Sequence, residues 1–80
     1  MNTTCIFLQI RCAPGTTYEV ADAIARKEKH SEMYSTSGNF DLLLKVYVPD
    51  DEDVGRFVNE YINSIEHVER TLTTLTFTAF

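Results

Sequence analysis

The sequence predicts a single α+β domain in which strands and helices follow one another in the order βαββαβ. Apolar residues alternate with other residues in three segments, which is typical of strands with one buried face. They recur at helical spacing in two further segments, and Pro, Gly and Asn stand at several of the boundaries. The 80 residues leave room for one domain, over residues 1–80.

Residues 3–12 and 40–48 predict the two most apolar strands. In each segment, every second side chain is apolar and would point to the same face of a sheet. The turn residues Pro14 and Gly15 follow the first segment. Pro49, which has no N–H to donate to a sheet, follows the second.

The other two predicted strands lie at residues 30–37 and 68–80. The first has few bulky apolar residues, so we expect it at an edge of the sheet. The second is rich in Thr, Leu and Phe, which favour strands. Between the second and third strands, Gly38 and Asn39 predict a tight hairpin turn in which glycine supplies a positive φ.

Residues 16–29 and 50–65 predict helices. Thr16 or Thr17 can cap the first, in which acidic residues come early and basic residues late, as the helix dipole favours. Asp50 is the predicted cap of the second helix, and three acidic residues follow it. These short charged runs therefore indicate helix ends rather than phosphate or metal sites.

Two helices between four strands in this order predict a ferredoxin-like fold. That fold is a four-stranded antiparallel sheet with both helices on one face. Right-handed crossovers place residues 3–12 and 40–48 at the centre of the sheet. These are the most apolar of the four strands, as the two central strands should be.

The sheet face without helices is also partly apolar. The two-residue period directs to it Phe7, Leu43, Tyr47 and either Leu72 or the pair Leu75 and Phe77. Contiguous exposed apolar patches usually mark interaction sites. We therefore expect two copies to dimerise through the sheet as a dimeric α/β barrel. The alternative is a loosely amphipathic sheet with scattered exposed apolar residues.

A domain this small usually needs help from disulfides, metal or oligomerisation. Cys5 and Cys12 would lie on one strand, ~23 Å apart and on opposite faces, which is too far for a disulfide. His30 and His67 are isolated and there is no CxxC, so we expect no metal site. Oligomerisation remains, and reduced cysteines are typical of a cytoplasmic protein.

The charge balance speaks against two classes of partner. The net charge is −5, whereas nucleic-acid-binding proteins usually present a basic patch, so we expect no direct contact with nucleic acid. No apolar run approaches the ~20 residues of a membrane span, and no basic segment follows Met1 as in a signal peptide. We expect no membrane contact.

Two segments resemble a known family. Residues 38–41 read Gly-Asn-Phe-Asp and precede the apolar residues 42–44, which matches a pattern of glycine, variable residue, aromatic, aspartate and apolar strand. Residues 68–73 are similar to the last strand of the same family. With its elements in matching order, the chain resembles the effector-binding (RAM) domain of Lrp/AsnC regulators without their DNA-binding domain. Phe40 stands where the family more often has Tyr, which removes one hydroxyl.

The resemblance implies dimers that assemble into rings, with an amino-acid-like ligand between dimers and full-length Lrp/AsnC regulators as candidate partners. By position, it implies ligand binding by Gly38, Asn39, Asp41, Thr71 and Thr73. N–H groups of a glycine turn can receive a carboxylate, Asp41 can accept from an ammonium, and threonine hydroxyls suit either group. The same residue types also build ordinary turns and strands.

Two other functions are compatible with this architecture. One is a small enzyme, similar to muconolactone isomerase or to antibiotic monooxygenases. An acid–base enzyme would need a His or a carboxylate in a pocket, whereas His30 and His67 lie at predicted element ends. We therefore predict no catalytic residue and no cofactor. The other function is an assembly module without a ligand, which an amino-acid screen would separate from the effector module.

Overall fold

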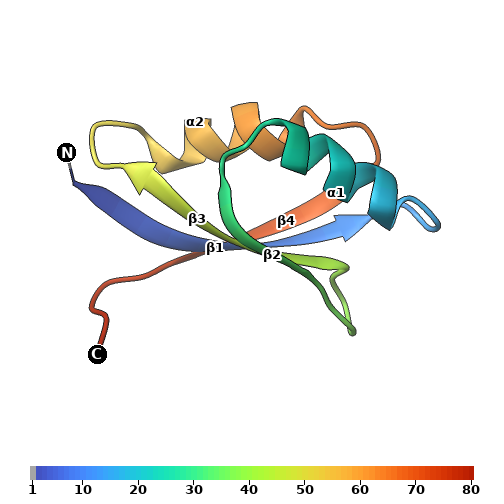
Figure 1. The fold of residues 1–80 in the computed structure, drawn as a ribbon, viewed down its shortest axis with the longest axis horizontal. Helices are drawn as coiled ribbons and strands as arrows, with labels where there is room; N and C mark the ends of the chain where they lie inside the picture. Colours follow the sequence, from blue (N-terminus) through green and yellow to red (C-terminus); the bar gives the residue numbers. More distant parts are fainter. Residues whose placement is uncertain (1) are drawn as a thin grey trace.

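The computed structural model describes residues 2–80. The elements are, in order, β1 (Thr3–Cys12), α1 (Thr17–Arg26), β2 (His30–Ser35), β3 (Leu42–Pro49), α2 (Val54–Val58), the π-helical turn η1 (Asn59–Asn63) and β4 (Val68–Leu75). The strands form one antiparallel sheet in the order β2-β3-β1-β4, and the helices lie over one face of it (Figure 1). The predicted ferredoxin-like fold is confirmed, with β1 and β3 at the centre and β2 at an edge.

The core lies between the helices and the sheet. The register pairs Ile6 with Val46 and Leu8 with Leu44, so the even-numbered side chains of both central strands point to the same side. The buried apolar residues are Ile6, Leu8, Ile10, Cys12, Val20, Ile24, Leu42, Leu44, Val46, Val48, Val58, Tyr61, Ile62 and Ile65. Burial of a large apolar side chain contributes roughly 1.5–3 kcal/mol, so this layer holds the domain together.

The first helix is shorter than the predicted range 16–29. Thr16 occupies the N-cap position, but its hydroxyl donates to the Ala13 carbonyl at 2.6 Å instead of capping the helix. The helix ends at Arg26, and Glu28 then adopts a φ of 54°. A left-handed residue just past a helix commonly terminates it.

The second helix begins later than the predicted range 50–65. Its cap is Asp53, whose Oδ1 accepts the Arg56 N–H at 3.0 Å. The predicted cap, Asp50, instead accepts a hydrogen bond from the Thr4 hydroxyl at 2.7 Å, which ties it to β1. The prediction is wrong at this end because two aspartates could cap the helix and β1 engages the first of them.

The π-helical turn η1 continues α2, and no periodicity in the sequence predicts it. Lys27 Nζ donates to the Tyr61 carbonyl at 2.7 Å, and the Ser64 hydroxyl donates to the Glu60 carbonyl at 3.0 Å. These donors come from outside the helical ladder and satisfy carbonyl oxygens near the end of the helix. A widened turn is rare, and here a side chain from the end of α1 supports it.

The connection between β2 and β3 is wider than the predicted tight turn. Gly38 has the predicted positive φ, at 93°, but β2 ends at Ser35 and β3 begins only at Leu42, so more than two residues join them. The loop instead covers residues 36–41 and is closed by the Thr36 N–H, which donates to the Asp41 carbonyl at 2.9 Å.

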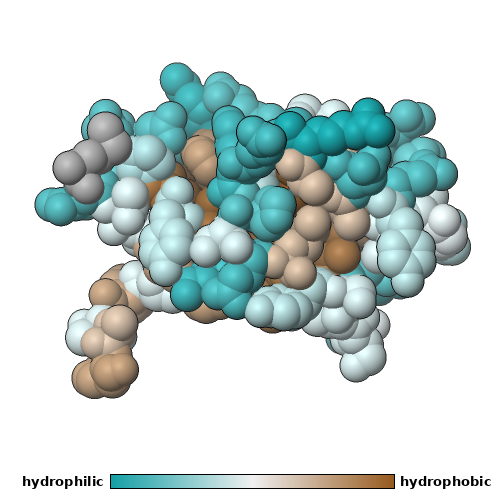
Figure 2. Space-filling view, viewed as in Figure 1, coloured by the Kyte–Doolittle hydropathy of each residue, from teal (hydrophilic) through white to brown (hydrophobic). Residues whose placement is uncertain are grey.

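The last strand ends at Leu75, short of the predicted residue 80. Leu75 pairs with Ile6, so continued pairing would bring the next residue opposite Cys5. Instead, the Thr76 hydroxyl donates to the Cys5 carbonyl, and a side chain takes the place of the backbone ladder. Residues 76–80 then turn away from the sheet on the side without helices, where they stand clear of the body of the molecule (Figures 1 and 2).

We call the sheet side without helices the open face. Its side chains include Phe7, Gln9, Arg11, Tyr34, Leu43, Lys45, Tyr47, Arg70 and Leu72. Of the two predicted alternatives on β4, Leu72 lies on the open face because it pairs with Gln9. Leu75 does not, because it pairs with a core residue of β1. Tyr47 is 47% and Leu72 46% exposed, so apolar surface on this face is open to solvent. Within residues 2–80, no helix is long and apolar enough to cross a membrane.

Candidate functional site at the hairpin end of the sheet

Three of the predicted binding residues lie in the loop of residues 36–41. We call this end of the sheet the hairpin end; it consists of that loop, the end of β1 and the start of β4. Gly38 and Asn39 are exposed there, and Asp41 is half-buried at the base of the loop. A Cβ at position 38 would meet no other atom within 4 Å, so glycine is needed for its positive φ rather than for space.

One carboxylate oxygen of Asp41 accepts a hydrogen bond within the fold, and the other is left for a ligand. Its Oδ2 accepts the Cys12 N–H at 2.7 Å, and its own N–H donates to the Ile10 carbonyl at 2.8 Å. The carboxylate thereby extends the β1–β3 ladder past the start of β3. Among residues 2–80, Oδ1 has no hydrogen-bond donor, so it can meet a cation from a bound molecule.

Two cations, which the sequence analysis did not single out, lie at the same end. Arg11 Nη1 donates to the Asn39 carbonyl at 3.3 Å, and Arg11 Nε lies 3.7 Å from Glu69 Oε1. Arg70 pairs directly with Arg11 across the strands, and its guanidinium lies 5.5 Å from the centroid of the Phe40 ring. The two-residue period alone places Arg11 on the open face, but only the β1–β4 register brings Arg70 beside it.

This arrangement brings two guanidinium groups, of Arg11 and Arg70, and two carboxylates, of Asp41 and Glu69, to one end of the sheet. Like charges directly opposite each other in a sheet are unfavourable, and here Glu69 and the Phe40 ring face the two guanidinium groups. Among residues 2–80, Arg11 faces the Glu69 carboxylate and Arg70 faces only the Phe40 ring, so the Arg70 guanidinium can receive an added anion. The hairpin end can therefore receive a molecule that carries both a negative and a positive group.

The two predicted threonines lie apart from the loop. Thr71 pairs with Ile10 and Thr73 with Leu8, which places both side chains on the helix side of the sheet. The Thr71 hydroxyl donates to Asn63 Oδ1 at 3.4 Å. The structure thus brings Gly38, Asn39 and Asp41 together but not the threonines.

Cys12 lies beside Asp41 but is poorly suited to nucleophilic chemistry. Burial, and after it the charge of Asp41, raises the pKa of the Cys12 thiol above its ordinary value. The reactive form of cysteine is the thiolate, which a raised pKa makes scarcer at neutral pH. Within residues 2–80, no group of three or more His, Cys, Asp or Glu side chains could hold a metal ion.

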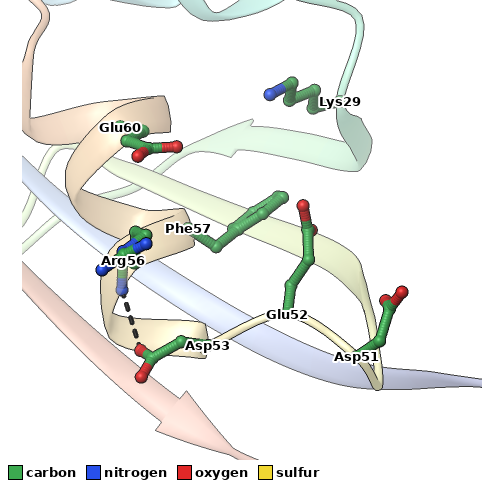
Figure 3. A pocket seen from close by; sticks show the side chains of 7 residues that line it. All are labelled: Lys29, Asp51, Glu52, Asp53, Arg56, Phe57 and Glu60. Atoms are coloured by element: carbon green, nitrogen blue, oxygen red, sulfur yellow. Dashed lines mark hydrogen bonds between the residues drawn. The ribbon is translucent and has the colours of Figure 1, made fainter.

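A hollow of about 470 Å³ lies beside α2, near the opposite end of β3 (Figure 3). It is lined by Lys29, Asp51, Glu52, Asp53, Arg56, Phe57 and Glu60. Lys29 Nζ lies 5.5 Å from the centroid of the Phe57 ring, and Asp53 is engaged as the cap of α2. Most of the wall is charged, and its charges are of both signs. We assign it no ligand.

The sheet, its open face and the charged hairpin end define a small α+β domain of the ferredoxin-like class. The profile of the Lrp/AsnC ligand binding domain matches residues 5–80. The chain belongs to this family, whose members include transcriptional regulators.

Curated relatives are about twice as long as this chain. An uncharacterized HTH-type transcriptional regulator of Pyrococcus horikoshii is 38% identical over 77 residues, which are 92% of this chain and 51% of the regulator. The HTH-type transcriptional regulator FL11 of Pyrococcus abyssi is 33% identical over 67 residues, which are 84% of this chain and 44% of FL11. The chain thus spans about half the length of the curated relatives it matches.

Solved structures have the same fold over nearly the whole chain. The crystal structure of TTHA0845 from Thermus thermophilus matches with a TM-score of 0.86 at 35% identity and covers 96% of both chains. A transcriptional regulator from Neisseria meningitidis, in complex with L-Met, matches with a TM-score of 0.80 at 16% identity. That match covers 94% of this chain and 50% of the regulator, and at this identity it shows the fold alone.

Proposed function

We propose that residues 1–80 form one effector-binding module that takes an amino-acid-like molecule at the hairpin end. One observation carries this proposal: Asp41 and the side chains of Arg11 and Arg70 lie at the same end of the sheet. A free amino acid has an ammonium and a carboxylate on one carbon atom, so it matches a site with groups of both charges.

Each group at the hairpin end has a distinct role in this proposal. Asp41 Oδ1 accepts from the ammonium, while Oδ2 stays bonded to the Cys12 N–H. Arg11, held by the Asn39 carbonyl, supplies the guanidinium for the carboxylate, with Arg70 beside it. Gly38 and Asn39 lie at the exposed part of the loop, where backbone N–H groups can add to carboxylate binding. Thr71 and Thr73 face the helices and are left out of the contacts.

The class of ligand has support from one fold neighbour. The Neisseria meningitidis regulator is described in complex with L-Met, which has the same two charged groups. The proposal assigns no catalytic residue to this chain, because the family is regulatory and the thiol nearest the site has a raised pKa.

We further infer that two copies pack through their open faces and that dimers assemble into rings. Exposed Tyr47 and Leu72, with half-buried Phe7 and Leu43, form the apolar surface that a second copy would cover. The proposed protein partners are full-length Lrp/AsnC regulators in the cytoplasm. Those partners would make the DNA contacts, since this chain is acidic.

The test uses the substitution Asp41→Asn and two probes that each lack one charge. A thermal-shift screen of the amino acids selects a ligand, and calorimetric titration then compares it with its methyl ester and with the acid that lacks the amino group. Hydrogen bonds to charged groups contribute about 1.5–3 kcal/mol, so Asp41→Asn should weaken amino-acid binding by roughly 10- to 100-fold. Binding of the acid without an amino group should hardly change.

The matched control is Asp51→Asn, which removes an exposed carboxylate beside α2. It should leave both affinities unchanged. Because asparagine can still accept the Cys12 N–H, Asp41→Asn should keep the Tm of the unliganded protein. Equal amino-acid affinities in wild type and Asp41→Asn would refute the ammonium role, and a lower Tm without ligand would assign Asp41 a structural role.

A further inference from the structure

Residues 76–80 end in two of the most exposed apolar side chains of the molecule. Phe77 is 95% and Phe80 117% exposed, and Figure 2 shows the tail extending away from the body of the molecule. Phenylalanine is among the residue types most often buried, and each ring covers roughly 150–250 Å² when it packs. Two such rings on an extended tail are unusual for a surface that meets only water.

The tail leaves the sheet at a fixed point and in a fixed direction. The Thr76 hydroxyl donates a hydrogen bond to the Cys5 carbonyl of β1, which anchors the start of the tail beside β1, just past the end of β4. From there, residues 76–80 run to the open-face side, opposite the helices (Figure 1). Their Thr and Phe side chains favour extended backbone, although no strand within residues 2–80 pairs with them.

The tail is long enough to reach a second sheet. Five extended residues span about 16 Å at ~3.3 Å per residue. Two sheets that pack face to face lie about 10 Å apart. The tail can therefore cross the interface and place an aromatic ring on the facing copy. By the two-fold symmetry of a dimer, the second tail would do the same in return.

The side chains of the tail add no charge repulsion between two copies. The whole chain has a net charge of −5, so two copies repel each other, but residues 76–80 carry no charged side chain. The receiving face contains aromatic and aliphatic side chains that are open to solvent, among them Tyr34, Tyr47 and Leu72. The aromatic side chains of the tail can pack there without adding to the repulsion.

We propose that residues 76–80 form an arm that crosses to the open face of a second copy and packs Phe77 and Phe80 against it. This inference rests on the dimer of the proposed function. It adds that the closed dimer depends on the arms as well as on the two sheet faces. The arms are exposed in the single chain because their receiving surface belongs to the other copy.

The experiment measures the dimer dissociation constant of the full chain by sedimentation equilibrium. Phe77→Ser with Phe80→Ser removes the rings from both arms, and we expect the Kd to rise at least about 100-fold. Phe77→Leu with Phe80→Leu keeps apolar side chains and should raise the Kd about tenfold or less. Tyr18→Ser, which removes an 87% exposed ring from α1 on the helix side, should leave the Kd unchanged.

Isotope-filtered NMR determines which copy the Phe77 and Phe80 side chains contact. In a mixture of labelled and unlabelled chains, we expect contacts between the Phe77 and Phe80 ring protons of one copy and open-face side chains of the other. Contacts within one chain only would overturn the arm, as would a serine variant that keeps the wild-type Kd. A serine variant that stays dimeric but no longer assembles into rings of dimers would also overturn the arm. A monomeric wild type would overturn the sheet-to-sheet dimer and the arm together.

Discussion

The two faces of the sheet are built from the same strands but meet different surroundings. On the helix face, Ile6, Leu8 and Leu44 are 0% exposed, because α1, α2 and η1 pack over them. On the open face, Tyr47 and Leu72, on β3 and β4, remain about half exposed. Neighbouring residues of one strand therefore differ in cover: the helices of the same chain bury one, and in the proposed dimer a second copy would cover the other.

This difference separates folding from assembly. The covered face provides the core that lets a single chain fold, and its residues should affect stability at any protein concentration. In the proposed dimer, the open face provides surface for a second copy, and its residues should affect stability only where copies associate. Leu43 and Leu44 are adjacent, of the same type and on opposite faces, so they allow a direct test.

The largest expected effect is that of Leu44→Ala on the covered face. Leu44 is 0% exposed and lies opposite Leu8 in the core, so the substitution leaves a cavity between sheet and helices. We expect the free energy of unfolding to fall by about 2–5 kcal/mol. Urea denaturation at several protein concentrations measures it, and the loss should be nearly the same at each concentration.

Leu43→Ala on the open face should act on association instead. Its side chain points to the surface that a second copy would cover, and two copies of it lie in each dimer. We expect the dimer Kd to rise roughly 10- to 100-fold, as measured by sedimentation, while the isolated chain stays folded by circular dichroism. Equal losses of stability for Leu43→Ala and Leu44→Ala at every concentration would remove the distinction between the faces.

The smallest expected effect concerns the one tyrosine in the core. Burial raises the pKa of Tyr61 to about 12 from the ordinary 10, and within residues 2–80 its hydroxyl has no hydrogen-bond partner. Between pH 10 and 12 the unfolded chain loses this proton while the folded chain keeps it. The stability contributed by the higher folded pKa is therefore complete below pH 10 and is lost as the pH rises toward 12.

Tyr61→Phe should remove this dependence and, at pH 7, raise the free energy of unfolding by about 1 kcal/mol, since no buried hydroxyl is left without a partner. Urea denaturation at pH 7 and at pH 10 to 12 measures both effects. The exposed ring of Tyr18 gives the matched control, Tyr18→Phe. A loss of stability at pH 7 would mean that the native protein supplies a partner for the Tyr61 hydroxyl.

The central strands were predictable because their signal is strong and local. Alternation along residues 3–12 and 40–48 gave the strand type and the side chains of each face, and the right-handed crossovers gave the central positions. The start of the second helix was not predictable, because Asp50 and Asp53 are the same residue type and either could cap the helix. Only a contact with Thr4 on β1 determines which of them serves.

The candidate site divides in a similar way. The motif at residues 38–41 marked the loop, and the loop indeed holds Gly38, Asn39 and Asp41 at one end of the sheet. The faces of Thr71 and Thr73, and the meeting of Arg11 with Arg70, depend on the register of β1 with β4. The residue pattern along each strand does not show how the two strands are aligned with each other.

By itself, the sequence determined the βαββαβ order, the central strands and an open apolar sheet face, because residue periodicity fixes which side chains share a surface. The tertiary structure decided the π-helical turn, the wide loop and the outward path of residues 76–80. Each of these depends on a bond between distant segments: Lys27 with Tyr61, Asp41 with Cys12, and Thr76 with Cys5. A local pattern cannot specify such a bond, because its free energy is available only after the sheet and helices have come together.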